Sequence, residues 1–177
     1  EKDLKVFKGN LKKQGYISEV KSVLSEFAQY GVDFERLDDF MKEVPPESYL
    51  HYKLDDIRTI YEKFEEYLSE KYITKEEMLD VLSDAVPYSD ILKGSVVAMD
   101  GFTGFTPVQN RLIGELFSVC EKVMITVTMD GRENPYVYEH PYQIFALGKQ
   151  MVTSLMKIAG EKKTEIEEPI CLFERPV

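Results

Sequence analysis

The chain has 177 residues, of which 44% are hydrophobic and 12% aromatic, enough for one ordinary domain or two small ones. Asp and Glu outnumber Lys and Arg by 32 to 22, and this net charge of −10 disfavours unaided, salt-sensitive binding to nucleic-acid phosphates. The sequence shows no run of 18 apolar residues and no basic-then-apolar leader. We therefore expect neither a transmembrane helix nor a secretory signal, and predict a cytoplasmic protein.

The charge is unevenly distributed along the chain. Residues 1–90 carry 13 Lys or Arg against 21 Asp or Glu, whereas residues 91–177 carry 9 against 11. We interpret the lysine-rich start as a solvated or frayed terminus. Cys120 and Cys171 have no CxxC spacing, so we predict two buried thiols rather than a disulfide or a zinc site.

Helical periodicity dominates residues 1–88. Apolar residues at spacings of three and four predict a first helix that begins near Gly15 and ends at Gly31. Asp33 is the expected N-cap of a short second helix. The Pro45-Pro46 pair ends that helix, because neither proline can donate a helix hydrogen bond.

The clearest predicted helix follows this proline pair. Its apolar stripe keeps a 4-3-4-3-4 spacing over about twenty residues, at Leu50, Leu54, Ile57, Tyr61, Phe64 and Leu68. Thr74 and Glu77 then form a capping box, which opens a further helix that ends at Pro87. These helices predict a helical part of the chain.

Near residue 90 the pattern changes to short, unbroken apolar runs. Val96–Met99 predicts a buried strand that ends on Asp100. A Thr, a Pro and a Gln within residues 106–109 predict a helix with a capping box. Val123–Met129 predicts a second buried strand, which ends on Asp130. A strand, a helix and a strand with short joints predict a βαβ unit with parallel strands.

The remaining residues predict an incomplete α/β part. A loop rich in proline and tyrosine, residues 134–141, precedes a helix that ends at Gly160. Ile170–Phe173 is predicted to form a third strand.

Asp100 is the first candidate for chemistry. An apolar parallel strand that ends on an acid is where nucleotide-hydrolysing folds hold a magnesium-coordinating Asp. Hydrolysis also needs a GxxxxGK[ST] phosphate loop and a carboxylate base beside the metal ligand. The sequence has neither, since Gly101 follows Asp100. A turn or helix-capping role for Asp100 is the alternative.

Other polar residues give weaker signals. His51 and His140 are isolated, which favours surface or packing roles. The acid pairs Asp38-Asp39 and Asp55-Asp56 lie on predicted helices, where neighbours point about 100 degrees apart, so we interpret them as solvated faces. Tyrosines of the long helix could stack on bases, but Tyr61 falls on the apolar stripe and predicts core packing. No catalytic residue and no metal site is predicted.

Residues 96–128 carry a more specific pattern, VVAMDGFTGFTPVQNRLIGELFSVCEKVMITVT. This segment resembles AddB/RexB subunits, in which a hydrophobic strand runs into Asp-Gly-Phe, an aromatic-Thr-Pro and a Gln-bearing helix. Upstream, Gly15-Tyr16, Leu54–Ile57 and Tyr61–Tyr72 also resemble the helicase-like region of that family. The resemblance therefore covers most of the chain.

The resemblance implies a degenerate motor. In related superfamily 1 helicases the same strand carries Asp-Glu, the Asp for magnesium and the Glu as base. Asp100 matches that Asp, and Gly101 replaces the Glu. Gln109 falls where those helicases place a Gln that senses the γ-phosphate, and Asp130 falls near the next motif, whose Gly-Asp-x-x-Gln pattern is missing.

The fold implied is α/β, with a helical subdomain of the helicase 1B type (residues 1–88) and part of a RecA-like, P-loop NTPase-type parallel-sheet core of the 1A type (residues 89–177). The segment would not hydrolyse ATP and would carry no cofactor. It would contact an AddA/RexA-type helicase-nuclease subunit and single-stranded DNA during double-strand-break repair and recombination.

Two alternatives remain open at this stage. One is an independent magnesium-dependent nucleotide-binding or hydrolase domain that uses Asp100 and Asp130 at neighbouring strand ends. The other is a protein-interaction module that does not touch DNA, which weak or salt-insensitive binding to single-stranded DNA would indicate.

Overall fold

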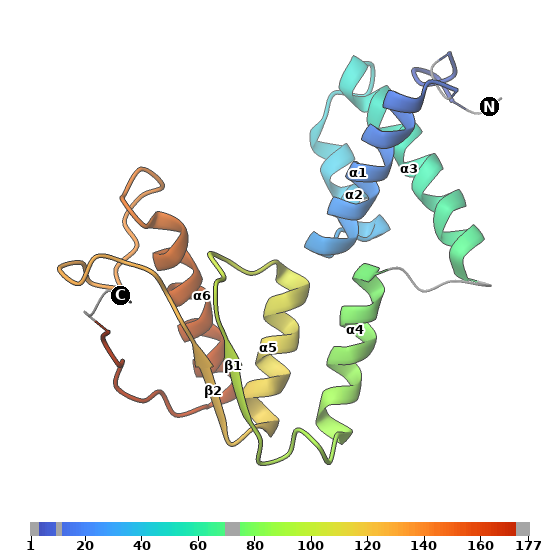
Figure 1. Ribbon diagram of the computed structural model, residues 1–177. Coiled ribbons are helices and arrows are strands. Elements are labelled where there is room, and N and C mark those ends of the chain that lie inside the picture. The colour runs from blue at the N-terminus through green and yellow to red at the C-terminus, as the bar shows by residue number, and fades with distance from the viewer. Residues whose placement is uncertain (1–3, 10–11, 70–74, 173–177) are drawn as a thin grey trace. The chain divides into compact units, whose positions relative to one another are not determined.

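The computed structural model describes residues 4–9, 12–69 and 75–172. The chain divides into two compact units, a helical unit (Glu1–Met78) and an α/β unit (Leu79–Val177) (Figure 1). The boundary expected from the sequence lies ten residues further along the chain. The assignment of the two parts to helicase subdomains stays a prediction.

Three helices build the helical unit. Helix α1 spans Gln14–Tyr30, α2 spans Phe34–Glu43 and α3 spans Tyr49–Ser69. Gly31 closes α1 in the left-handed conformation (φ 63), which a residue without a Cβ adopts at little cost. The side chain of Asp33 caps α2 by accepting a backbone N–H bond at 2.9 Å. These three helices, the Gly31 end and the Asp33 cap are confirmed.

Tyr61 belongs to the larger of the two cores found among the described residues of this unit. Its ring packs against the rings of Phe27 and Phe34, with centroids 5.7 and 4.7 Å away. Its hydroxyl donates to the carbonyl of Val32 at 3.3 Å. The predicted core role of Tyr61 is therefore confirmed. The buried members of this core are Leu24, Leu37, Val44, Leu54 and Tyr61.

Asp56 of α3 is a fully buried carboxylate that holds the N-terminal strap, residues 4–9. It accepts backbone N–H bonds from Lys5, Val6 and Phe7 at 2.7, 2.7 and 2.8 Å. The strap has no regular secondary structure, so its free N–H groups supply the donors that a buried charge requires. The interpretation of Asp56 as solvated is therefore wrong. Residues 4–9 are not frayed, whereas Lys5 and Lys8 are exposed, as the solvated alternative predicts.

The α/β unit alternates helices with two strands. Its elements are α4 (Lys75–Ala85), whose first four residues fall in the helical unit, the short 3-10 helix η1 (Val86–Tyr88), β1 (Val96–Met99), α5 (Pro107–Val119), β2 (Lys122–Ile125) and α6 (Ala146–Lys162). The two strands pair in parallel, with Val96 opposite Lys122, which confirms the βαβ unit. The capping box predicted at Thr74 and Glu77 lies partly outside the described residues.

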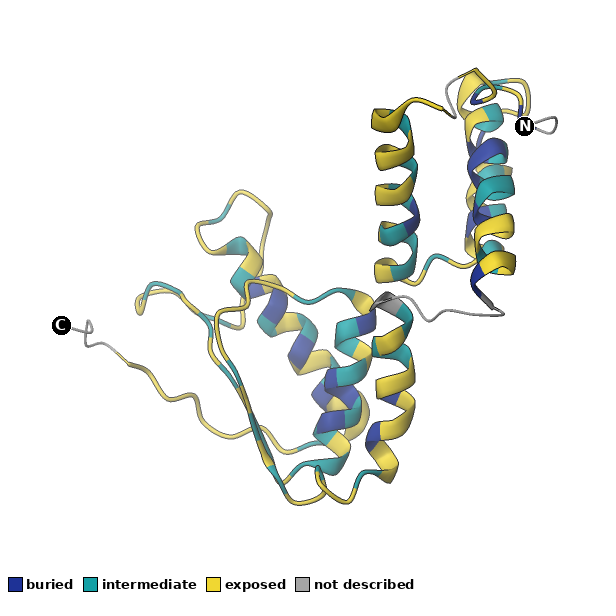
Figure 2. Cartoon of the chain, turned by 45° about the vertical axis from the view of Figure 1, so that its right-hand side comes forward, coloured by how far each residue is buried: buried dark blue, intermediate teal, exposed yellow. Residues whose placement is uncertain are grey.

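The sheet is packed on one face. Ile113 of α5 and Met151 and Leu155 of α6 form a core, against which Met99 and Ile125 pack from the strands. Exposure alternates along β1, and along β2 from Val123 onward, so the residues on the opposite face are open to solvent. Figure 2 shows the buried positions of α5 and α6 in dark blue. The strands, predicted as buried, are therefore buried on one side only.

Strand β2 is shorter than predicted. It ends at Ile125, and residues 126–130 continue without regular secondary structure, although the sequence predicts a strand to Met129. The physical reason is that β1 ends at Met99, opposite Ile125: the N–H of Thr126 still donates to the carbonyl of Met99, but the residues after Thr126 have no neighbouring strand.

Two further expectations for the C-terminal part are wrong. Ile170 to Leu172 do not form the predicted third strand, and Phe173 lies outside the described residues. Cys171 is exposed and Cys120 is half-buried, so the two thiols are not both core residues. The fold class is α/β with a two-stranded parallel sheet, whereas a RecA-like core stays a prediction.

Candidate functional site

Asp100 follows the last residue of β1, at the carboxyl end of the parallel sheet. Thr126 holds the matching position after β2, and its backbone N–H donates to the carbonyl of Met99 at 3.0 Å. The hydroxyl of Thr126 donates to Oδ1 of Asp100. The carboxylate that the sequence singled out is therefore bonded to the neighbouring strand end.

Gly101 turns the chain away immediately after Asp100. Its φ of +80 lies in the region that residues with a Cβ rarely adopt, while no atom lies within 4 Å of the place where a Cβ would be. The glycine is therefore required by backbone conformation and not by crowding. A glutamate at this position would be strained unless the backbone changed.

Gln109 belongs to the capping box at the start of α5. Its Oε1 accepts from the backbone N–H of Thr106 at 2.9 Å, and its own N–H donates to the Thr106 hydroxyl at 3.4 Å. The predicted capping box is confirmed. The side-chain oxygen Oε1 of Gln109 is therefore used to cap the start of α5.

Asp100 and Gln109 both line an open hollow of about 470 Å³ beside the end of β1. Apolar side chains supply most of the wall, and the rings of Phe102 and Phe105 lie 4.9 Å apart. No Lys or Arg is among the lining residues. The hollow suits a flat apolar group better than a phosphate, which needs cations or a cradle of backbone N–H groups.

Asp130 makes a separate local cluster with Arg132. It accepts from the Arg132 backbone N–H at 2.9 Å and from the guanidinium at 3.0 and 2.6 Å. These hydrogen bonds lower the pKa of Asp130 to about 2. Asp100 and Asp130 therefore have different partners, and the described residues contain no group of three or more His, Cys, Asp or Glu side chains that could hold a metal ion.

Sequence reasoning missed two polar contacts of this unit. The contact between Thr126 and Asp100 could have been predicted by aligning the ends of the two strands in parallel register. Lys149 of α6 is buried and forms an ion pair with Glu133 at 2.5 Å. The same predicted helix also carries Lys157, so a lysine among its apolar residues did not by itself indicate that pair.

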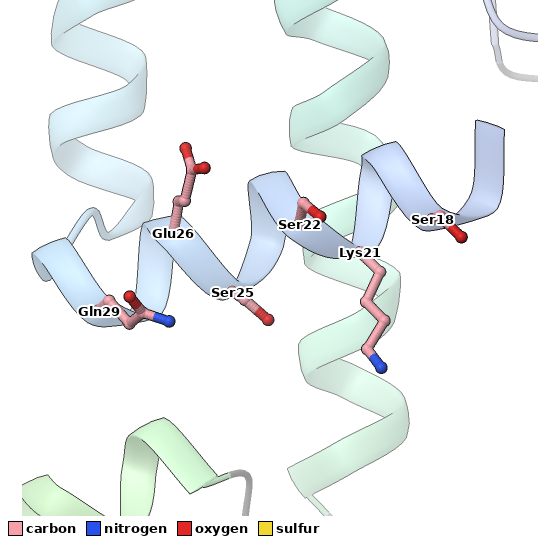
Figure 3. Close-up of a pocket in the computed structure, with 6 residues that line it drawn as sticks. All are labelled: Ser18, Lys21, Ser22, Ser25, Glu26 and Gln29. Atoms are coloured by element: carbon pink, nitrogen blue, oxygen red, sulfur yellow. The ribbon is translucent and has the colours of Figure 1, made fainter. Parts of the chain in front are cut away.

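A second hollow lies along the polar face of α1. Figure 3 shows its lining, which comes from this helix alone: Ser18, Lys21, Ser22, Ser25, Glu26 and Gln29. The side chains are all polar, and they lie along the surface of one helix. A solvated helix face accounts for this arrangement without any chemistry.

A comparison with protein families places the chain. The family model described as "ADDB, N-terminal" matches residues 1–176. The chain belongs to the AddB N-terminal family. Among the described residues of this AddB-family chain, no helix is both long and apolar enough to span a bilayer.

Curated relatives agree with the family. The chain is 41% identical over 169 residues to a protein of Lachnoclostridium phytofermentans, which covers 95% of the chain. It is 33% identical over 174 residues to one of a Thermoanaerobacter species and 32% identical over 178 residues to one of Clostridium acetobutylicum, each covering 98% of the chain. All three are named as the B subunit of an ATP-dependent helicase/deoxyribonuclease. The chain spans about 15% of the length of each.

Proposed function

We propose that this AddB-family chain is a non-catalytic, helicase-like segment of the B subunit of an ATP-dependent helicase/deoxyribonuclease. The observation that supports this most is the state of Asp100. Its carboxylate accepts the Thr126 hydroxyl, and the residue after it is a glycine in a left-handed conformation. The position where related helicases carry a catalytic Glu therefore offers no carboxylate and no backbone suited to one.

The remaining parts of a nucleotide site also support this proposal. Phosphoryl transfer depends on cations and backbone donors around the phosphates. The hollow beside Asp100 has a mainly apolar wall without Lys or Arg, and the Gln109 oxygen is engaged in the capping box. The alternative hydrolase, with one magnesium ion between Asp100 and Asp130, would require Asp130 to leave its Arg132 partner.

In the complete complex, this segment would guide single-stranded DNA and contact an AddA/RexA-type helicase-nuclease subunit. The process would be the repair and recombination of double-strand breaks in the cytoplasm. The segment would carry no cofactor of its own, and its parallel strands would form part of a RecA-like core. The word "subunit" in the names of the relatives supports the partner, and the AddB family supports the process.

A reconstituted complex tests this proposal. The full-length AddB-type protein with Asp100→Ala, assembled with its AddA/RexA-type partner, should keep ATP turnover and DNA unwinding within about twofold of the unaltered complex. Thr126→Val is the matched variant, because it frees Asp100 without removing the carboxylate. A loss of tenfold or more with Asp100→Ala, but not with Thr126→Val, would show that Asp100 acts in hydrolysis.

A further inference from the structure

The loop between Asp130 and α6 exposes several large apolar side chains. We call residues 131–145 the aromatic loop. Tyr142 is 91% exposed and Ile144 75% exposed, and four further apolar side chains of this loop are more than one third exposed: Tyr136, Val137, Tyr138 and Phe145. Figure 2 shows the segment before α6 mainly in the colours of exposed and intermediate residues. Several exposed apolar side chains within one short segment are a feature of interaction sites.

The aromatic loop is held in shape by its own polar side chains. Oε1 of Gln143 accepts from the backbone N–H groups of Glu139 and His140 at 2.9 and 3.4 Å. Nε2 of Gln143 donates to the Glu139 carboxylate at 3.2 Å. The Asn134 side chain closes a turn by accepting from the N–H of Tyr136 at 2.9 Å. The loop is therefore ordered by hydrogen bonds that bury little of its surface.

Two ion pairs fix the base of the aromatic loop. Asp130 binds Arg132, and Glu133 binds Lys149, whose side chain is 3% exposed. An ordered loop that presents aromatic side chains has already lost conformational entropy before it binds. Tyrosine is among the residue types that contribute most energy at protein interfaces. The arrangement fits a binding loop.

The charges of the loop favour a protein partner over nucleic acid. Stacking proteins that bind single strands combine aromatic side chains with a basic groove. Here the guanidinium of Arg132 is neutralised by Asp130, and the ammonium of Lys149 is neutralised by Glu133. Glu139 remains as an exposed carboxylate, hydrogen-bonded to an uncharged amide. Phosphates would therefore be repelled, whereas an apolar surface with a basic residue would be complementary.

We propose that the aromatic loop is a docking surface for the partner subunit, which meets it with an apolar patch carrying a Lys or Arg opposite Glu139. The proposal rests on the proposed function, since the relatives are named as one subunit of a complex. It adds the place of contact and the chemistry of the partner's surface.

The test uses the full-length AddB-type protein and its partner subunit. A Tyr142→Ser/Ile144→Ser variant should weaken association at least tenfold, as loss of an aromatic anchor does at interfaces. The matched control, Tyr88→Ser/Ile91→Ser, removes the same side-chain types at 86% and 88% exposure and should change the affinity by less than twofold. Equal affinities for the two variants would overturn the proposal.

Gln143→Ala tests whether the order of the loop contributes. It removes the Gln143 side chain that accepts from Glu139 and His140, but no apolar side chain. We therefore expect weaker association together with faster hydrogen exchange at Glu139 and His140. Faster exchange without any change in affinity would overturn the claim that the ordered conformation of the loop contributes to docking.

Two other occupants of the aromatic loop would give different results in these experiments. If the loop is already protected from exchange in the full-length AddB-type protein alone, the remainder of that protein covers it, and the proposal fails. If the loop variant weakens single-stranded DNA binding but not subunit association, nucleic acid is the occupant, and the proposal again fails. The unaltered full-length protein tests the proposed function separately, since its failure to associate with a partner subunit would refute that function. The loop variants test only where the contact lies.

Discussion

Replacing Asp56 by Asn should release the N-terminal strap. The carboxylate accepts three backbone N–H bonds, two on Oδ2 and one on Oδ1. The single oxygen of Asn can keep the two bonds from Val6 and Phe7, while its amide group faces the N–H of Lys5. One charge-assisted hydrogen bond is lost, at about 1.5–3 kcal/mol, and a buried donor is left unsatisfied. We expect a total cost of about 3 kcal/mol.

Hydrogen exchange of the strap amides measures this effect. Since about 1.4 kcal/mol corresponds to a factor of ten, the amides of Lys5, Val6 and Phe7 should exchange about 100-fold faster in Asp56→Asn. Asp55→Asn is the control, because Asp55 pairs with the exposed side chain of Lys5 and its loss should change the exchange rates little. Exchange within about threefold of the unaltered chain would refute the conclusion that Asp56 holds the strap.

Three further predictions concern the α/β unit. The carboxyl carbon of Asp130 should titrate near pH 2 by NMR, and at a higher pH in Arg132→Ala, which removes the guanidinium bonds but keeps the backbone hydrogen bond. Because the folded-state pKa is lowered, this contribution to stability is present above about pH 4 and is lost as the pH falls through about 2. Thr106→Ala should lower the free energy of unfolding by about 1 kcal/mol in urea titrations. Thr103 is exposed, and Thr103→Ala should change this free energy little. An equal loss of stability in the two variants would argue against the Thr106 cap. Ile113→Ala should cost about 2–5 kcal/mol in the same experiment, and a loss below about 1 kcal/mol would show that Ile113 is not central to the core.

Features that depend on a few neighbouring residues could be predicted from the sequence. The Gly31 end of α1, the Asp33 cap and the capping box at residues 106–109 all involve partners no more than four or five residues apart. The strand Val96–Met99 was predicted with its observed ends, because an unbroken apolar run is bounded by a turn on each side.

Features that depend on distant residues could not be predicted. The donors to Asp56 lie about fifty residues away in the chain, so a buried acid and a solvated acid look alike in the sequence. The end of β2 depends on where β1 ends, and hence on the pairing register. Cys171 follows no periodic segment, and only the fold shows that it lies outside the core.

The candidate site was predictable in position but not in bonding. Asp100 was found because an acid ended an apolar strand, whereas its bond to Thr126 follows from the parallel register of the two strands. The pairing of Asp130 with Arg132 is local, and the Asp-Gly-Arg sequence could have indicated it through the turn that such a sequence favours.

Direct measurement of nucleotide binding tests the central claim, that this AddB-family segment is not a working motor. The purified chain and its Asp100→Ala variant would be titrated with ATP and magnesium in a calorimeter, and phosphate release would be followed in the same samples. We expect no saturable ATP binding and no ATP turnover above the background of Asp100→Ala. Saturable, magnesium-dependent binding with turnover that Asp100→Ala abolishes would contradict it.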